Sequence, residues 1–136
     1  MPEPFFSRKL PLQVAVALLS LIPISVGAMG ILLGPRWLGL DPPWPASLDS
    51  HFRYLSGIFF AGGVAFVSTI PRIERHTGRV RLLAALVVAG GLARAYSLSA
   101  VGMPTSGHLF GLAMELIVTP LLVIWQARVA ASNPGR

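Results

Sequence analysis

Four long apolar stretches constrain this chain more than any other feature of its sequence. They cover about residues 11–34, 51–70, 82–103 and 109–129. Each has the ~20 residues that an α-helix needs to cross ~30 Å of hydrocarbon. Only helices and closed barrels satisfy their backbone hydrogen bonds in lipid, and these stretches lack the strict alternation of a membrane β-strand. We therefore predict an all-α fold: a membrane-embedded four-helix bundle that forms a single domain over residues 1–136.

The composition agrees with this class. Hydrophobic residues make up 54% of the chain and charged residues only 12%, against about 25% charged residues in soluble domains. The chain has no cysteine, which excludes disulfides, thiolate metal sites and cysteine nucleophiles. The net charge is +6, but the basic residues cluster at the ends of the apolar stretches. That distribution indicates membrane topology, so we expect no nucleic-acid partner.

The basic residues also predict an orientation. Arg36 and Arg53 lie on one side of the predicted bundle, and eight Lys or Arg residues lie on the other: Arg8, Lys9, Arg72, Arg75, Arg79, Arg81, Arg128 and Arg136. Loops rich in Lys and Arg stay in the cytoplasm. Both termini are therefore expected on the cytoplasmic side, in a topology with N-in and C-in.

The first stretch has a second interpretation. Arg8 and Lys9, the apolar run after them and the small residues Val26-Gly27-Ala28 resemble a signal peptide with its cleavage site. Cleavage there would leave three crossings and move the N-terminus across the membrane. The apolar run continues to Leu33, however, which is long enough to span the bilayer. We therefore expect the segment Met1 to Gly34 to stay attached as the first helix.

Two ionisable residues, Arg94 and Glu115, lie inside the third and fourth stretches. A charge in hydrocarbon is costly unless it is paired or faces water. Arg94 precedes Met103 by a helical rise of ~13 Å, and Glu115 follows Gly107 by ~12 Å. Because a tight turn joins the two helices, these charges are expected at the same depth and within reach of each other.

Other polar residues are expected near this pair, and the candidate site is the polar cluster Arg53, Arg94, Ser97, His108 and Glu115. One interpretation is a buried ion pair that fixes helix register. The other is a polar pocket in the outer leaflet that holds an anionic or polar ligand, or a protonatable carboxylate. His51, His76 and His108 have no metal-ligand spacing, although His108 and Glu115 could share a site. We predict no metal site, no cofactor and no catalytic residue.

Several short motifs carry a family resemblance: Arg53-Tyr54-Leu55-Ser56-Gly57, Pro71-x-Ile73, Gly90-Gly91-Leu92-Ala93-Arg94, Gly102-Met103-Pro104, and Glu115 with Pro120. In these, residues 12–128 resemble a bacterial family of small four-helix membrane proteins known only as a domain of unknown function. The architecture is also similar to that of DoxX-like proteins, some of which are associated with membrane redox complexes. The resemblance implies a multi-pass protein of the bacterial cytoplasmic (inner) membrane, and it supplies no catalytic residue.

These observations favour a non-enzymatic function. We expect a bundle that binds a lipid or another polar ligand, or an accessory subunit of a membrane complex. The alternative is a component of a proton- or anion-coupled transporter that uses Arg94 and Glu115. An enzyme acting on a lipid or a quinone is a third possibility, which the single intramembrane carboxylate disfavours. The expected partners are membrane lipids, together with a membrane protein or a second copy of the chain.

Overall fold

The structure is a computed structural model that describes residues 5–133. Helices and short connections account for this whole range, and no strand occurs in it. The predicted all-α class is therefore confirmed. Arg136, one of the basic residues that predict the orientation, lies outside the described range, as do the first four residues of the predicted domain and of the segment Met1 to Gly34.

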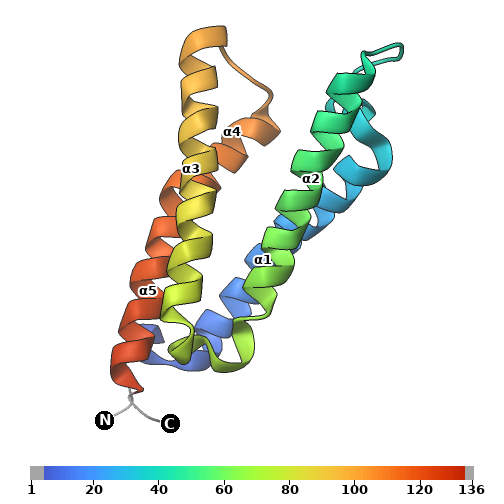
Figure 1. Cartoon of the computed structure of the whole chain (residues 1–136). Coiled ribbons are helices and arrows are strands. Elements are labelled where there is room, and N and C mark those ends of the chain that lie inside the picture. Colours follow the sequence, from blue (N-terminus) through green and yellow to red (C-terminus); the bar gives the residue numbers. More distant parts are fainter. Residues whose placement is uncertain (1–4, 134–136) are drawn as a thin grey trace. The chain divides into compact units, whose positions relative to one another are not determined.

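The chain forms two compact units (Figure 1). The first, here called the α1–α2 unit, comprises Gln13–Pro71. The second, here called the α3–α5 unit, comprises the residues up to Leu12 and those from Arg72 onward. The first turn of α1 therefore belongs to the α3–α5 unit. Each unit is described separately below.

The α1–α2 unit is an antiparallel helical hairpin (Figure 1). It contains most of α1 (Lys9–Leu33), the 3₁₀ turn η2 (Gly34–Leu38) and α2 (Ala46–Val67). Glycines bring the two helices together, because a Cβ added at Gly27 would lie only 2.7 Å from the backbone nitrogen of Phe60. Small residues allow this close approach of helix backbones. The helix α1 ends at Leu33, and the next residue, Gly34, has a φ of +60°, which residues with a side chain rarely adopt.

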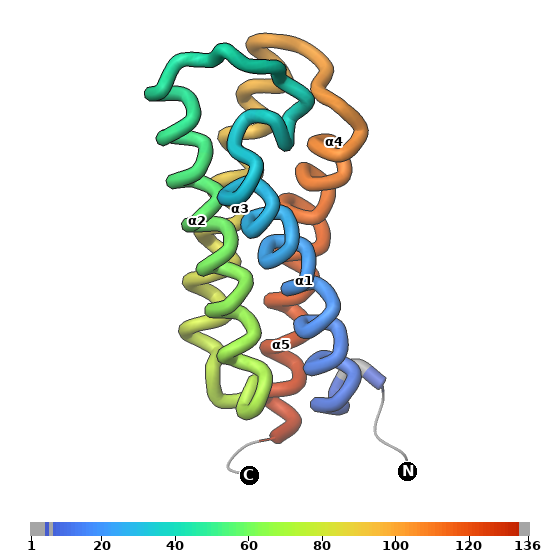
Figure 2. The backbone as a smooth tube through the Cα atoms, turned by 90° about the vertical axis from the view of Figure 1, so that its right-hand side faces the viewer, coloured from blue at the N-terminus to red at the C-terminus, as the bar shows by residue number. Residues whose placement is uncertain are grey.

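The α3–α5 unit is a second helical hairpin with short flanking turns. It contains η1 (Phe5–Ser7), most of η3 (Ile70–Arg75), and α3 (Thr77–Val101). After Gly102 and Pro104 the chain returns through α4 (Ser106–Ala113), the π-helical turn η4 (Met114–Val118) and α5 (Thr119–Ser132). These last three elements form one continuous helix of 27 residues, whose course can be followed in Figure 2.

Three helices of the described range are long and apolar enough to cross a membrane: Lys9–Leu38, Thr77–Val101 and Ser106–Ser132. Large apolar side chains along them are exposed, for example Leu18 at 62% and Leu86 at 64%. Such exposure is favourable in lipid and costly in water. The chain therefore has the properties of a membrane protein. The helix α2 is not among these three, and His51 and Arg53 lie near its start.

Candidate functional site

Arg94 of α3 and Glu115 of η4 form a two-pronged ion pair. The Arg94 Nε atom donates to Glu115 Oε2 at 2.9 Å, and Nη2 donates to Oε1 at 3.0 Å. The Glu115 side chain is 11% exposed and that of Arg94 is 32% exposed. This geometry matches the planar fork of a guanidinium to the two oxygens of a carboxylate, which is the strongest form of side-chain ion pair. The pair joins two of the three candidate membrane spans.

Gly91 allows the two helices to approach closely enough for this pair. A Cβ added at Gly91 would lie 2.7 Å from Leu116 Cδ2 and 2.8 Å from Glu115 Cβ. Both distances are shorter than a carbon–carbon contact of ~3.5–4.0 Å. Gly91 therefore packs directly against the turn that carries Glu115, one helical turn before Arg94. The neighbouring Gly90 has open space where its Cβ would be.

A π-helical turn, Met114–Val118, carries Glu115. Pro120 explains this turn, because proline has no N–H to donate to the carbonyl of Leu116 and its ring crowds that carbonyl. The chain widens instead, and the Thr119 N–H bonds to the carbonyl oxygen of Met114, five residues earlier. The Thr119 hydroxyl donates to the same oxygen at 2.9 Å. Turns of this kind are rare and occur frequently at functional sites.

The Arg94 guanidinium retains donor capacity. Its Nε and Nη2 atoms bind Glu115, whereas Nη1 has no hydrogen-bond partner among residues 5–133. Gly111 lies beside the group, with its would-be Cβ 3.8 Å from Arg94 Cζ, so no side chain at that position covers the guanidinium. This arrangement leaves at least two N–H donors directed at neither the carboxylate nor the backbone.

The other two predicted site residues of this unit lie nearby in sequence but make different contacts. His108 Nδ1 is 2.8 Å from the Thr105 hydroxyl at the start of α4. Ser97 is exposed on α3, about one turn beyond Arg94. The contacts of the described residues therefore join Arg94 to Glu115 directly and do not include a hydrogen bond from either His108 or Ser97 to that pair.

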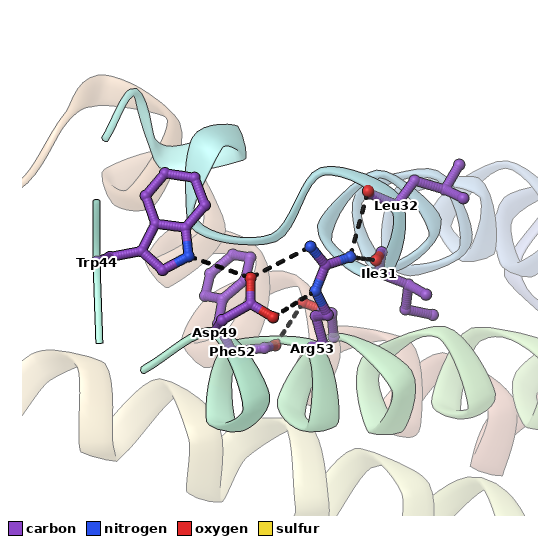
Figure 3. A network of polar contacts seen from close by, with 7 residues as sticks. Ile31, Leu32, Trp44, Asp49, Phe52 and Arg53 are labelled. Atoms are coloured by element: carbon purple, nitrogen blue, oxygen red, sulfur yellow. Dashed lines mark hydrogen bonds and ion pairs between the residues drawn. The ribbon is translucent and has the colours of Figure 1, made fainter. Parts of the chain in front are cut away.

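Arg53, the fifth predicted site residue, belongs to the α1–α2 unit and closes the end of α1 (Figure 3). Its Nε donates to Asp49 Oδ2 at 2.8 Å and its Nη2 donates to Asp49 Oδ1 at 3.2 Å. Its Nη1 binds the carbonyl oxygens of Ile31 and Leu32. The C-terminus of a helix has unpaired carbonyls and a partial negative charge. The Arg53 guanidinium donates to the carbonyls and offsets that charge.

Asp49 also accepts a hydrogen bond from the Trp44 indole at 3.3 Å, so a single carboxylate holds both the loop and the capping arginine (Figure 3). Gly34 provides the room, since a Cβ there would lie 2.6 Å from Asp49 Oδ1. These roles of Trp44 and Asp49 were not predicted from the sequence. The spacing of four between Asp49 and Arg53 on a helix was the available signal.

Gln126 is a polar residue of α5 that the sequence analysis did not place in the site. It is fully buried, and its Nε2 donates to the carbonyl of Ile73 at 2.8 Å and to the Thr77 hydroxyl at 2.9 Å. Its Oε1 has no hydrogen-bond partner within the described range. The amide therefore fastens η3 and the start of α3 to α5. A glutamine within the apolar run of residues 120–127 was the signal in the sequence.

A second ion pair of the α3–α5 unit lies outside the central part of the helices. Lys9 Nζ is 2.9 Å from Glu74 Oε2. Burial alone would raise the pKa of Glu74, but the hydrogen bond from Lys9, a backbone N–H and the positive charges of Lys9 and Arg75 outweigh it. The pKa of Glu74 therefore lies below its ordinary value, and this carboxylate stays ionised at neutral pH.

No group of three or more His, Cys, Asp or Glu residues in the described range could hold a metal ion. No curated protein and no solved structure matches the chain. A family model described as a domain of unknown function, DUF4345, matches residues 11–126. This match extends from the first turn of α1 to Gln126 near the end of α5 and includes both Arg94 and Glu115. The chain therefore belongs to the DUF4345 family, whose function is unknown.

Proposed function

We propose that this chain is a small, non-enzymatic membrane protein that binds a polar or lipid-like ligand at the Arg94–Glu115 pair. One observation carries the proposal: a partly exposed guanidinium, held in place by a carboxylate, keeps its Nη1 atom unpaired between two candidate spans. A purely structural pair in this position gains nothing from an unpaired donor, because an unsatisfied polar group is costly in hydrocarbon.

The chemistry of the pair defines the ligand. Nη1 offers N–H donors in a fixed plane, which suit the oxygens of a phosphate, a carboxylate or a carbonyl group. Glu115 already balances the charge of Arg94, so a neutral headgroup with carbonyl or hydroxyl oxygens also fits. The same two spans also expose apolar side chains, such as Phe110 at 55%, which would contact the apolar part of a lipid-like ligand.

The setting of this site is part of the proposal. We infer four membrane crossings in one bundle, with both termini in the cytoplasm of a bacterial cell and the site in the outer half of the cytoplasmic membrane. The support is the asymmetry of basic residues, the three apolar helices, and the exposed apolar face of α2, which includes Ile58 and Val64. An architecture like that of DoxX-like proteins, and a role as an accessory subunit, are compatible with this arrangement.

The proposal is tested by the ligands that copurify with the full chain. The protein is extracted in a neutral detergent, and bound lipids, quinones and proteins are identified by mass spectrometry. We expect a ligand that is lost from an Arg94→Leu/Glu115→Leu variant. The matched control is Lys9→Leu/Glu74→Leu, which also removes one ion pair without changing the net charge. Equal ligand content in all three proteins would refute a binding site at Arg94 and Glu115.

A second candidate function is a component of a proton- or anion-coupled transporter. The observation that favours it is the π-helical turn around Glu115, the one carboxylate of that span. Such turns interrupt a regular helix and occur frequently at functional sites. Proton flux into liposomes that contain the purified protein tests it. Flux above that of empty liposomes, abolished by Glu115→Gln, would favour the transporter over the binding protein.

A further inference from the structure

One end of the α3–α5 unit is strongly basic. Seven Lys and Arg residues lie in or beside η1, η3, the first turns of α3 and the last turns of α5: Arg8, Lys9, Arg72, Arg75, Arg79, Arg81 and Arg128. The described residues of the same segments include one acidic residue, Glu74, which Lys9 pairs with at 2.9 Å. We call this set of seven residues the basic end. Among the described residues of these segments, basic residues therefore outnumber acidic ones by seven to one.

Specific contacts hold the segments of the basic end together. The buried Gln126 amide ties α5 to Ile73 of η3 and to Thr77 of α3. The Asn133 side chain donates to the carbonyl of Ser7 in η1 at 3.5 Å. The rings of Phe5 and Trp125 have centroids 5.9 Å apart. Four separate segments therefore present their arginines from a fixed scaffold and not from a loose loop.

Three arginines of the basic end are available to a ligand. Arg72 of η3, Arg81 of α3 and Arg128 of α5 are exposed, and none of their guanidinium groups has a hydrogen-bond or ion-pair partner among residues 5–133. They come from three different elements. Arginine binds phosphate oxygens with two parallel N–H donors, which makes a set of exposed arginines a phosphate-binding surface.

The location of these arginines indicates which kind of phosphate-containing ligand they bind. Arg81 lies in the second turn of the candidate span Thr77–Val101, and Arg128 lies in the last turns of the span Ser106–Ser132. The apolar surface begins immediately beside them, since Leu82 is 63% exposed and Leu86 is 64% exposed. A ligand with a phosphate and an acyl chain fits both surfaces together. A soluble phosphate or a nucleic acid would contact the arginines but not the apolar surface beside them.

We propose that the basic end is a binding site for the headgroups of anionic phospholipids in the surrounding membrane. Arg72, Arg81 and Arg128 contact the phosphates, and the apolar surface of α3 beginning at Leu82 contacts the acyl chains. This site is distinct from the Arg94–Glu115 pair and does not depend on the function proposed for that pair. Each basic residue near an anionic surface contributes about a fivefold gain in affinity at low salt.

The test is a lipid titration of the full chain in dodecyl maltoside. Dioleoyl phosphatidylglycerol or dioleoyl phosphatidylcholine is added, and bound lipid is counted by native mass spectrometry. We expect phosphatidylglycerol to bind at least tenfold more tightly, and an increase in salt to reduce only that preference. An Arg72→Gln/Arg81→Gln/Arg128→Gln variant should lose most of it, by up to about a hundredfold if three contributions add. The control is Arg36→Gln, which removes an exposed arginine of η2 in the other unit.

Several results would overturn the proposal. Equal affinity for the two lipids is one, and an unchanged preference in the triple variant that keeps wild-type circular dichroism is another. A loss in Arg36→Gln equal to the loss per arginine in the triple variant would indicate a diffuse effect of net charge. Displacement of the lipid by 10 mM glycerol 3-phosphate would assign the site to a free phosphate. Tighter binding of single-stranded polyuridine RNA than of phosphatidylglycerol would assign it to nucleic acid.

Discussion

Leucine substitution of Arg94 and Glu115, singly and together, measures how strongly the pair couples α3 to the α4–α5 helix. The carboxylate is almost fully buried, with 11% of its side chain exposed, and both of its oxygens accept from Arg94 at about 3 Å. Removal of one partner of a buried pair generally costs about 3–5 kcal/mol. The leucine pair buries no charge, so the double variant should unfold within about 1 kcal/mol of the wild type.

The two single variants leave different groups without a partner. Arg94→Leu leaves the buried Glu115 carboxyl group, and Glu115→Leu leaves the Arg94 guanidinium, which cannot lose its proton. Both single variants should therefore be strongly destabilised.

Unfolding in mixed micelles of dodecyl maltoside and sodium dodecyl sulfate, followed by circular dichroism, gives the four free energies of the double-mutant cycle. The expected coupling energy is at least about 5 kcal/mol, because the two single losses of about 3–5 kcal/mol add and the double variant loses at most about 1 kcal/mol. If both single variants unfold within about 0.5 kcal/mol of the wild type, the two side chains do not meet in the folded protein. If the stable double variant still fails to complement a null strain, the pair has a function beyond stability.

Three further predictions concern other residues. The chain has no cysteine, so a single introduced cysteine reports its own accessibility. In intact cells an impermeant thiol reagent should label Ser47→Cys and should not label Gly78→Cys, both at exposed positions. The opposite pattern would contradict the predicted orientation. Gly91→Ala should destabilise by about 1–3 kcal/mol in thermal unfolding through overpacking, whereas the control Gly90→Ala, which has open space, should not; equal effects would contradict the close packing at Gly91. Because the pKa of Glu74 is lowered, its ion pair stabilises the fold above pH ~4.3, and this stabilisation is lost as the pH falls further. The free energy of unfolding of Glu74→Gln should therefore fall less steeply between pH 5 and pH 3 than that of the wild type. Identical pH profiles of the two proteins would exclude the Lys9 pair.

The Arg94–Glu115 contact illustrates what helical geometry predicts from sequence. A fixed rise of 1.5 Å per residue and a short uncharged turn place two residues at the same depth when each is equally far from that turn. In the structure the same two side chains are within 2.9 Å. Neighbouring antiparallel helices share a local reference point, the turn itself, so the depths of the two residues follow from sequence positions alone.

Arg53 shows why the other site residues were harder to place. Its partners include the carbonyls of Ile31 and Leu32, more than 20 residues away. Those contacts depend on where α1 ends and how closely α2 packs against it. The sequence shows Gly34, but not that the chain adopts a left-handed conformation there and exposes the last carbonyls of α1 to a cation. Local patterns therefore indicated a polar cluster without its actual hydrogen bonds.

The π-helical turn has a consequence for how the length of this chain can change in evolution. A π-turn is an α-helix that contains one extra residue. Deletion of one residue within Met114–Val118 would restore a regular helix without rotating α5 relative to α4, so Gln126 would still meet Ile73 and Thr77. The same deletion within 121–125 would turn Gln126 by about 100° and break those bonds. We therefore expect homologues that lack the π-turn to be shorter by one residue in this segment and to have lost Pro120 as well.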